Sequence, residues 1–520
     1  MDPIQIYACS LGGIALILLT FRVMKAISYH GPYWPVWLVR IVRYISRKIM
    51  FLLLKHVLYP RVFHQRSRYW VLLQSIYWGG TITCNFIRTH TLQHMATRAG
   101  NLALLNFIPL LLAGRLDLAA DLLGIPIRSY IRVHGTFGLM ACVQAVVHVI
   151  ISVRERGWSP DQLLQIYGLI AISAFALSVI LIFIRRFVYE VFIKSHYLLA
   201  VLALVAIWRH VRFQRNFAQL YMLVGSGLLI TTTTLHWIIL IIRNITLDRF
   251  GSRARVSRGR DSQVAQVVIP INRPFTVHAG MTVRIWMPGV SLFSWLYSHP
   301  FTISWWETNK EGKATSITLL IQKKHGFTKS LIDHPGKEFI TWVDGPYGTS
   351  YNMAQYDNVL MVASGVGIIA QIPYIRQLLD FQPKNIFVAW EVTDESNLNW
   401  VYQWMDQLLA RDTGSYILRF GLYMPCSSDT AGIGQPWNSK HDRIWKLSGD
   451  IDPWKVVSTE FWRQDGSALV TVSANKRIRK TLRDVIQRKM EHVVDIIELP
   501  YQPDEFQSQR HRKRQSEERV

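Results

Sequence analysis

Cysteine is scarce in this chain: only four of its 520 residues are cysteines, and they lie far apart. Cys9, Cys84 and Cys142 fall in apolar stretches, and Cys426 stands alone in the C-terminal half. A zinc site needs closely spaced cysteines or histidines, and a disulfide framework is typical of short secreted chains with an even set of cysteines. The cysteine pattern therefore favours neither.

Acidic residues are also few, since 34 Asp and Glu stand against 58 Lys and Arg and leave a formal net charge of +24. Nucleic-acid binding is one interpretation of such a charge. However, the basic residues crowd the ends of apolar runs, most densely in residues 22–68 and 243–260. Membrane electrostatics explains that distribution better, so we expect no nucleic acid partner. Acidic residues are nearly absent inside the apolar runs, which argues against an ion-coupled transporter.

Long apolar runs are confined to residues 1–243, whereas residues 244–520 have the composition of a soluble protein. The run Val36–Leu58 contains five Arg and Lys residues, so it predicts an interfacial helix and not a span. Seven other runs approach the roughly 17–25 residues that a helix needs to cross a membrane. These predicted spans are Ile4–Phe21, Tyr69–Ile87, Leu102–Leu118, Ile131–Val153, Leu163–Ile184, Val191–Arg209 and Ala218–Ile242.

The charges at the ends of these runs predict the orientation. Asp2 precedes the first run and Arg22 follows it, the reverse of a cleavable signal peptide, so we expect this run to remain as an anchor. Placing most basic edges inside gives an outside N-terminus, seven crossings and a cytosolic C-terminal half. Arg209, Arg212 and Arg215 then fall outside, against the rule.

Four histidines form the most informative pattern. His134 and His148 lie in one apolar run and His196 and His210 in another, each pair 14 residues apart. Fourteen residues of α-helix rise about 21 Å and return to nearly the same face. Two such helices side by side would stack two pairs of imidazoles, a geometry suited to two b-type haems. The alternative is four unrelated polar residues, which the equal spacings and the cost of ionisable groups in lipid make the weaker interpretation.

The segment 264–351 predicts a small antiparallel β-barrel, because short β-rich runs alternate with turn residues. Its predicted strands are Val264–Ile269, Thr282–Trp286, Ser316–Ile321 and Phe339–Val343. Between them, the segment containing His299, Pro300, Phe301, Thr302 and Ser304 offers an imidazole and hydroxyls to a planar ring and its polar chain. The backbone from Gly326 to Thr328 suits a diphosphate. Taken singly, each is also an ordinary strand end or turn.

An α/β unit follows. The buried-strand pattern Asn358–Ala363 leads into Gly365, Gly367 and Ile368, a G-x-G-x-x-A sequence that we expect to open a helix and to bind a nucleotide phosphate. Alone, such a glycine loop is weak evidence. A second strand, Asn385–Trp390, ends at Glu391, about where an acid can meet a ribose hydroxyl.

The order of these modules resembles the ferric reductase and NADPH oxidase superfamily, most closely the fungal plasma-membrane ferric/cupric reductases. The likeness runs from Tyr69 to about Leu499 and includes the spacing of the histidines. Four further segments are similar to the family's strand leading to the flavin, its FAD motif, its Gly-Pro-Tyr-Gly loop and its nicotinamide-phosphate loop. They are His278–Val283, His299–Thr302, Gly345-Pro346-Tyr347-Gly348, and Gly365–Ile368 with Pro373-Tyr374.

The resemblance implies a multi-domain membrane protein in which an α-helical bundle of seven spans precedes a flavin barrel and an α/β nucleotide domain. The expected parts are an anchor and basic segment (1–68), a six-helix haem domain (69–243), an FAD domain (244–352), an NAD(P)H domain (353–506) and a disordered tail (507–520).

The implied function is electron transfer from cytosolic NADPH through FAD and two haems b to an extracellular ferric or cupric chelate, in the plasma membrane. His134 and His196 would hold the inner haem, and His148 and His210 the outer one. An iron-uptake protein is a possible partner, and the sequence leaves the oligomeric state open.

One segment departs from the family pattern. Ser473-Ala474-Asn475 stands where members carry Cys-Gly-Pro facing the nicotinamide, so Ser473 is expected to serve as a small polar replacement. Two alternatives remain open: a superoxide-forming NADPH oxidase, and a membrane protein that has lost electron transfer and binds nucleotide or partners. Glu391 favours NADH, whereas the resemblance implies NADPH.

Overall fold

The computed structural model describes most of the chain, and it divides into two compact units, Met1–His236 and Trp237–Val520. The predicted interfacial helix Val36–Leu58 and the tail from Gln507 lie outside the described residues. Those residues are 2–30, 68–185, 187, 189–212, 217–258, 263–291, 294–295, 297–324, 326–381, 383–392, 395–414, 416–424, 435–436, 441–461, 466–489 and 494–501.

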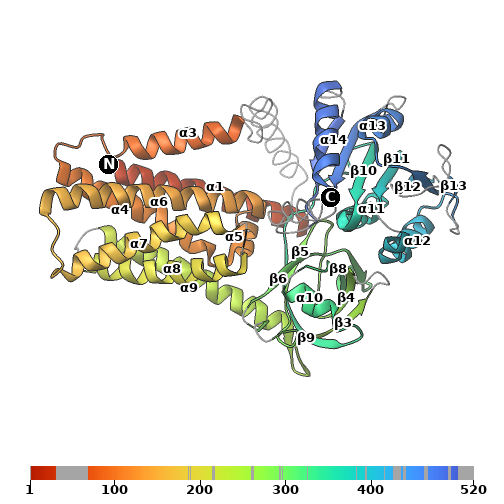
Figure 1. The fold of residues 1–520 in the computed structure, drawn as a ribbon, viewed down its shortest axis with the longest axis horizontal. Coiled ribbons are helices and arrows are strands. Elements are labelled where there is room, and N and C mark those ends of the chain that lie inside the picture. Colours follow the sequence, from red (N-terminus) through yellow and green to blue (C-terminus); the bar gives the residue numbers. More distant parts are fainter. Residues whose placement is uncertain are drawn as a thin grey trace, which may run out of the picture. The chain divides into compact units, whose positions relative to one another are not determined.

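The first unit is a bundle of long apolar helices (Figure 1). In the described residues, five helices are long and apolar enough to cross a membrane, namely α1, α6, α7, α8 and α9. The helices are α1 (Pro3–His30), α3 (Arg68–Thr83), α4 (Leu92–Leu111), α5 (Leu116–Leu122), α6 (Ile127–Arg156), α7 (Leu163–Ile184), α8 (Tyr189–Val211) and α9 (Phe217–Asn244). The chain is therefore an integral membrane protein, as predicted.

The predicted span Leu102–Leu118 falls on a bent pair of helices in the structure. Helix α4 ends at Leu111, a 3₁₀ turn covers Leu112–Arg115, and α5 continues at 95° to α4. Pro109 removes one backbone donor and crowds the preceding turn, which weakens the end of α4. The apolar composition continues through the bend, so hydropathy alone predicts one span. Counted as one broken span, this pair brings the described total to six. Helix α3, with 16 residues, is shorter than a typical span.

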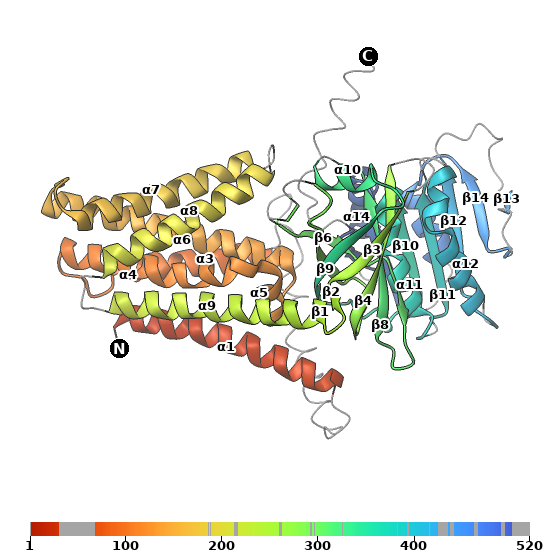
Figure 2. The ribbon, with the colours of Figure 1, turned by 90° about the horizontal axis from the view of Figure 1, so that it is seen from below.

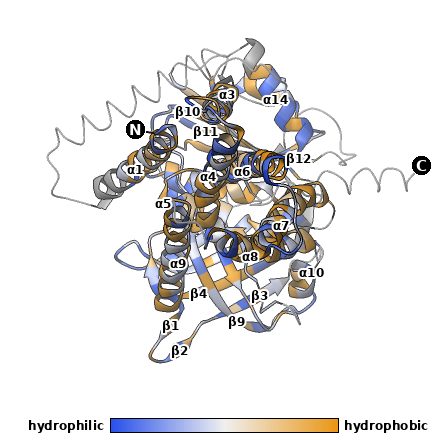
Figure 3. Ribbon diagram, turned by 90° about the vertical axis from the view of Figure 1, so that its left-hand side faces the viewer, coloured by the Kyte–Doolittle hydropathy of each residue, from blue (hydrophilic) through white to orange (hydrophobic). Residues whose placement is uncertain are grey.

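Apolar side chains cover the outside of the bundle as well as its interior. Figure 3 shows hydrophobic colouring along its helices. Phe183 on α7 is 73% exposed and Leu198 on α8 is 71% exposed. Such large exposed apolar surfaces are typical of helices that face lipid. Inside, α4 packs along α6 and α7 along α8, with Phe107, Ala206 and Met222 in a shared core.

The second unit begins with a curled antiparallel sheet of seven strands in the order β6-β5-β9-β3-β4-β8-β7 (Figure 2). Its edge strands β6 and β7 are joined by only two residues, Ile303 and Ser304, so the sheet must bend to bring its edges together. A short hairpin precedes it. The strands are β1 (Ile245–Thr246), β2 (Arg249–Phe250), β3 (Ser252–Arg258), β4 (Val264–Phe275), β5 (Thr282–Trp286), β6 (His299–Thr302), β7 (Trp305–Thr308), β8 (Ala314–Gln322) and β9 (Glu338–Tyr347), with the short helix α10 (Phe327–Ile332) after β8.

An α/β sheet follows, in the order β13-β14-β12-β11-β10-β15-β16, parallel except for β13. The chain builds outward from β10 toward β12 and then returns to the other side of β10 with β15. This change of direction between β10 and β15 is the position where open α/β sheets bind ligands. The strands are β10 (Asn358–Ser364), β11 (Asn385–Glu391), β12 (Leu418–Met424), β13 (Gln435–Pro436), β14 (Ile444–Ser448), β15 (Ala468–Ser473) and β16 (Val494–Glu498), and the helical segments are η2 (Gly365–Ala370), α11 (Ile372–Leu378), η3 (Glu395–Trp400), α12 (Tyr402–Arg411), α13 (Pro453–Phe461) and α14 (Lys476–Lys489).

Asn244 fastens the end of α9 to the curled sheet. Its amide nitrogen donates to the carbonyl of Val343 at 2.9 Å, and its amide oxygen accepts from the Val343 N–H at 2.7 Å. Asn244 also accepts through its own carbonyl from the side chain of Asn272, and it is 2% exposed. Both halves of the side chain therefore substitute for a strand neighbour of β9.

We predict that Asn244→Ala destabilises the second unit by roughly 2–4 kcal/mol, because it leaves a buried N–H and a buried carbonyl of Val343 without partners. The measurement is the thermal midpoint of the solubilised protein together with its rate of cleavage by trypsin. Asn352→Ala, at an exposed asparagine whose side chain accepts from the Ala354 N–H, is the matched control and should change neither. Equal stability of the two variants would contradict the role given to Asn244.

Candidate functional site

The structure brings the four histidines together in two pairs. His134 on α6 faces His196 on α8, with ring centroids 6.1 Å apart and planes at 79°. One level further along the same helices, His148 faces His210 at 6.2 Å and 83°. Because the first histidine of α6 meets the first of α8, the two helices run in the same direction.

These separations match two axial ligands of one metal ion. An imidazole nitrogen lies about 2 Å from a first-row transition metal that it binds, and the ring centre lies about 1 Å behind the nitrogen. Two imidazoles on opposite sides of one ion therefore have centroids about 6 Å apart. Both pairs meet this requirement, and in the described residues no group of three or more potential metal ligands gathers elsewhere. The pairs fit bis-histidine haem sites.

Hydrogen bonds fix the rings of the second pair. The Nδ1 atom of His148 lies 2.8 Å from the carbonyl oxygen of Ala96, and that of His210 lies 2.8 Å from the carbonyl oxygen of Leu164. Bonding Nδ1–H to a carbonyl leaves Nε2 as the free ligand atom, which is the usual arrangement of metal-bound histidines. Neither carbonyl was foreseen from the sequence.

Two glycines allow these bonds. A Cβ atom at Gly100 would lie 3.0 Å from Nδ1 of His148, and one at Gly168 would lie 3.1 Å from Nδ1 of His210. Gly100 follows Ala96, and Gly168 follows Leu164, by one helical turn. A side chain at either glycine would crowd the imidazole that approaches the carbonyl. The only sequence signal for them is a glycine inside each apolar helix.

The first pair has different surroundings. The Nδ1 atoms of His134 and His196 are buried and have no hydrogen-bond partner in the described structure. The ring of Phe192 stacks on His196 at 5.5 Å. A Cβ atom at Gly135 would meet nothing within 4 Å, which leaves open space beside His134. Arg132 lies over the ring of Trp70 at 5.4 Å.

In the curled sheet, His299 lies on β6 and stacks on Phe327 with centroids 4.0 Å apart. Its Nε2 atom is buried and has no hydrogen-bond partner among the described residues, so it can bond to a ligand. Burial, and then the nearby Arg284 guanidinium, lower the pKa of His299 to about 4, so the imidazole is neutral at neutral pH. Pro300 and Phe301 continue the same strand.

The hydroxyls expected to meet a flavin are engaged within the protein. Thr302 donates to the Tyr501 carbonyl at 3.4 Å. Ser304 is fully buried and accepts from the Leu320 N–H, and Thr328 accepts from the Lys324 N–H. Gly326 has φ of +69°, a backbone conformation that glycine adopts readily. Within this predicted set, His299 Nε2 is the buried side-chain atom that has no hydrogen-bond partner among the described residues.

The Gly-Pro-Tyr-Gly motif lies mainly on strand β9 and only its end forms a turn. Gly345 and Pro346 are in the strand, the Tyr347 hydroxyl donates to the Asp344 carboxylate, and Gly348 follows with φ of +102°. Thr282 on β5 donates to the Tyr347 carbonyl. The motif therefore lies where the end of β9 meets the start of β5.

The glycine loop of the α/β unit lies at the change of strand direction. Gly365 has φ of +51°, and a Cβ atom at Gly367 would lie 1.8 Å from the Ser473 carbonyl oxygen. The residues from Gly365 to Ala370, including Ile368, form a buried 3₁₀ turn, and the α-helix expected to open here begins only at Ile372. The loop and the end of β15 thus touch, and only glycine fits at 367.

Ser473 does not present its hydroxyl to the surface. It is 1% exposed and accepts a hydrogen bond from the Gln371 amide at 2.7 Å. Thr471, two residues earlier on the same face of β15, donates to the Gln371 oxygen at 2.8 Å. Gln371, which sequence reasoning missed, ties the glycine loop to β15. No local pattern distinguishes it from a solvated glutamine.

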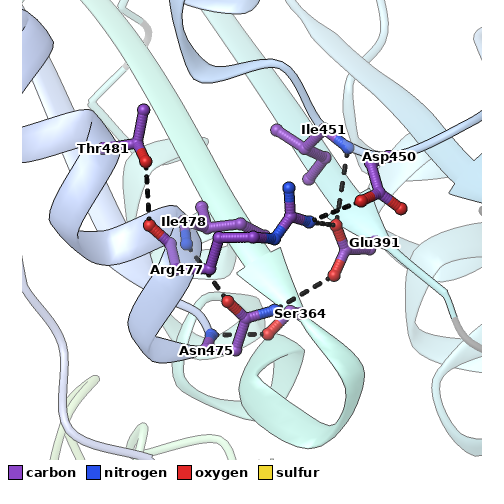
Figure 4. Close-up of polar contacts among 8 residues, drawn as sticks. All are labelled: Ser364, Glu391, Asp450, Ile451, Asn475, Arg477, Ile478 and Thr481. Carbon is purple, nitrogen blue, oxygen red and sulfur yellow. Dashed lines mark hydrogen bonds and ion pairs between the residues drawn. The ribbon is translucent and has the colours of Figure 1, made fainter.

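Glu391 ends β11 in a polar cluster (Figure 4). Its carboxylate accepts from the Asn475 amide at 3.1 Å and from Arg477 at 2.9 Å. Asn475 also donates its backbone N–H to the Ser364 hydroxyl at 2.7 Å and accepts from the Ile478 N–H. Arg477 pairs in addition with Asp450 at 3.0 Å. The carboxylate expected to meet a ribose thus holds the start of α14 against the end of β11.

Comparison with known proteins matches two segments to ferric reductase families. Residues 99–207 match the ferric reductase like transmembrane component, and residues 356–441 match the ferric reductase NAD binding domain. The first match includes His134, His148 and His196, and the second includes the glycine loop and Glu391. The resemblance to ferric reductases predicted from the sequence is therefore confirmed.

Three curated relatives are fungal. Ferric reductase transmembrane component 3 of Saccharomyces cerevisiae is 28% identical over 56% of this chain and 41% of its own length. Ferric/cupric reductase transmembrane component 2 of the same yeast is 26% identical, also over 56% and 41%. The probable cell surface ferric reductase kap2 of Aspergillus oryzae is 24% identical over 42% and 30%. The matched part of this chain thus spans about 41% of the length of the two yeast relatives.

Solved structures give weaker likenesses. A flavohemoglobin from Malassezia yamatoensis aligns with 82% of this chain and 98% of its own at 13% identity and a TM-score of 0.38. A ferredoxin NADP+ reductase from Neisseria gonorrhoeae aligns with 48% and 97% at 9% identity and a TM-score of 0.34. Scores this low support no conclusion about the present chain.

We predict that the second unit loses stability as pH falls from about 6.5 to about 4. The pKa of His299 is lower in the folded chain than in the unfolded chain. Between these two pKa values the imidazole is protonated only in the unfolded state, so a fall in pH stabilises the unfolded state. The effect amounts to at most about 3 kcal/mol. The measurement is the thermal midpoint at pH 7.5 and pH 5.

His299→Asn should flatten this pH dependence, whereas His334→Asn, at a histidine that bonds the Ser330 carbonyl at the end of α10, should leave it in place. Identical pH slopes in the wild type and in His299→Asn would disprove the prediction.

Proposed function

We propose that the chain is a transmembrane oxidoreductase that carries electrons from a cytosolic reduced nicotinamide nucleotide, through FAD and two haems b, to an extracellular ferric or cupric chelate. The resemblance implies NADPH as the donor. The observation that carries the proposal is that α6 and α8 bring their histidines together at two levels. The ring centroids are 6.1 Å apart for His134 and His196, and 6.2 Å apart for His148 and His210. The match to ferric reductase families supports it.

Each cofactor has candidate residues. His134 and His196 would hold one haem, and His148 and His210 the other. The segment from His299 to Ser304, Gly326, Thr328 and the residues Gly345 to Gly348 would hold FAD, and Gly365, Gly367 and Ile368 would hold the nucleotide phosphates. When bound, these groups supply the redox chemistry, while the protein supplies ligation, orientation and exclusion of water.

Two helix carbonyls fix the orientation of the outer histidines. The Ala96 and Leu164 carbonyls hold His148 and His210 in one tautomer and one orientation, so their Nε2 atoms need no rearrangement to bind metal. Each haem would be held by two histidines, so an acceptor would receive electrons at an edge of the site and not by coordination to the iron. We propose seven crossings, with α3 and the bent α4–α5 pair as two of them, and a plasma-membrane location with the second unit cytosolic.

Connectivity supports the order of the two haem sites. Helix α8 ends at Val211, directly after His210, and α9 then runs 28 residues to Asn244, where the second unit's strands begin. Twenty-eight residues of helix span about 42 Å, enough to return across the bilayer. The chain thus leaves the bundle at the end that carries His134 and His196, which supports these histidines as the inner pair.

A second candidate function is superoxide formation by an NADPH oxidase, because both activities use a six-coordinate outer haem. A third is a protein that has lost electron transfer. The observation favouring the third is that the Ser473 hydroxyl is buried and bonded to the Gln371 amide. Flavin and haem that persist through purification but are not reduced by NADPH or NADH would support it.

We predict bis-imidazole b-type bands in the dithionite-reduced minus oxidised spectrum of the purified protein. His148→Ala should lose roughly half of them, because it removes a ligand of one of two haems. Gly100→Val should also lose up to half, since its side chain would displace the His148 ring from the Ala96 carbonyl. Gly227→Val, where an added Cβ meets nothing within 4 Å, is the control and should keep the full spectrum. A wild-type protein without these bands refutes the proposal.

We predict that ferric-chelate reduction driven by the nucleotide is insensitive to superoxide dismutase, because the chelate takes its electrons directly at the edge of the outer site. The assay follows a coloured ferrous complex under air and under argon, with and without the dismutase. Loss of most of the activity with dismutase, or under argon, would instead identify dioxygen as the acceptor.

A further inference from the structure

The end of the bundle that carries His148 and His210 has a basic rim. We define this rim as five exposed arginines: Arg88, Arg154, Arg156, Arg209 and Arg212. Arg209 is adjacent to His210 on α8, and Arg212 lies just beyond the end of that helix. Arg154 and Arg156 lie in the last turns of α6, about 9–12 Å of helix rise beyond His148. The arginines of α6 and α8 therefore lie at the end of the bundle that carries the outer imidazole pair.

Few acidic side chains compensate this charge. Glu155 in the last turn of α6 and Asp161 just before α7 are the exposed carboxylates of this described segment. Asp2 lies at the same end, and it already pairs with Arg98, which is 2% exposed and donates to the carbonyls of Cys84 and Ile87. Five arginines against two further carboxylates leave the rim positive. The sequence adds Arg215, which lies outside the described residues.

Two features indicate that the rim is there for a ligand. The rule that basic residues gather on the cytosolic side argues against arginines at the outer end, so topology does not explain them. Arg88 also has φ of 54°, a left-handed conformation that costs a non-glycine residue energy and is enriched where a side chain is needed for function. A glycine or asparagine would fit this turn with less strain.

Electrostatics identifies the ligand's chemical class. A positively charged rim beside the outer histidine pair raises the local concentration of anions and speeds their association with the protein. It repels cations. Ferric ions bound by polycarboxylates are anionic complexes, whereas hydrated cupric and ferric ions are cationic. Resting on the proposed function, the geometry points to the basic rim as a docking surface that selects anionic metal chelates as electron acceptors.

The experiment measures the outer half of electron transfer alone. The purified full chain, in neutral phosphatidylcholine nanodiscs, is reduced with dithionite, freed of excess reductant and mixed with an acceptor, and reoxidation of the haem bands is followed. The acceptors are ferric EDTA and ferricyanide, which are anions, and hexaammineruthenium(III), a cation. No nucleotide or flavin step is involved, so the result does not depend on whether NADPH reduces the protein. Absence of haem bands would count against the proposed function itself.

We predict that reoxidation by the two anions slows as ionic strength rises, whereas reoxidation by the cation speeds up. The triple variant Arg154→Gln, Arg156→Gln and Arg212→Gln should slow the anions roughly tenfold at low salt and speed the cation, with an unchanged haem spectrum. Removing the opposing charges, with Glu155→Gln and Asp161→Asn, should shift both rates the other way by about twofold.

The matched control is Arg249→Gln, Arg253→Gln and Arg255→Gln, which removes the same charge from exposed positions on β2 and β3 and should change no rate. Equal slowing of anions and cation would mean that the variant disturbs the haem and not the encounter. Weaker binding of the rim variant to phosphatidylglycerol vesicles with unchanged acceptor rates would mean that the rim binds lipid phosphate alone. Either result would overturn the proposal.

Discussion

Two imidazole pairs must keep the same separation at two levels of one pair of helices, and most of the bundle follows from this constraint. The centroid distances differ by only 0.1 Å although the levels are 14 residues apart, so α6 and α8 keep a constant spacing over that length. Apolar packing alone tolerates sliding and rotation of helices in lipid, because the lipid-facing and protein-facing surfaces are equally apolar. Direct imidazole-to-carbonyl hydrogen bonds restrict this freedom within two helix pairs: Ala96 links α4 to α6, and Leu164 links α7 to α8. Those are also the two helix pairs that pack most extensively.

The same arrangement occurs on both helices that support the outer pair. In α4 the bonded carbonyl belongs to Ala96 and the glycine is Gly100, and in α7 they are Leu164 and Gly168. A helical carbonyl normally lies beneath the side chain one turn later, so a glycine at that position opens it to a second donor. This explains why each carbonyl accepts from a histidine while remaining in its helix. The inner histidines lack such supports in the described structure, and a stacked phenylalanine, Phe192, limits the motion of His196 instead.

The apolar run, the strand pattern and the histidine spacing each repeat regularly in the sequence, and the structure shows the corresponding regular elements. The run Leu163–Ile184 and the strand Thr282–Trp286 have the predicted bounds, and the 14-residue spacing predicted which histidines face each other. Features that depend on distant residues were missed. The bend after Leu111 lies within continuous apolar sequence, so hydropathy does not mark it. The inward direction of Ser473 depends on Gln371, which is 102 residues away in the chain, and the engagement of Glu391 depends on Asn475 and Arg477.

The departure at Ser473-Ala474-Asn475 has a limited effect on the nucleotide site, and the backbone explains why. The contact between the glycine loop and β15 is made by the Ser473 carbonyl, which any residue supplies, and by the absence of a side chain at Gly367. Phosphate recognition by such a loop uses backbone N–H groups and is therefore independent of the side chain at 473. Asn475 donates its backbone N–H to the Ser364 hydroxyl, a bond that proline at this position cannot make. The asparagine therefore ties this segment to the end of β10. At position 473 itself, the hydroxyl is buried and accepts a hydrogen bond from the Gln371 amide.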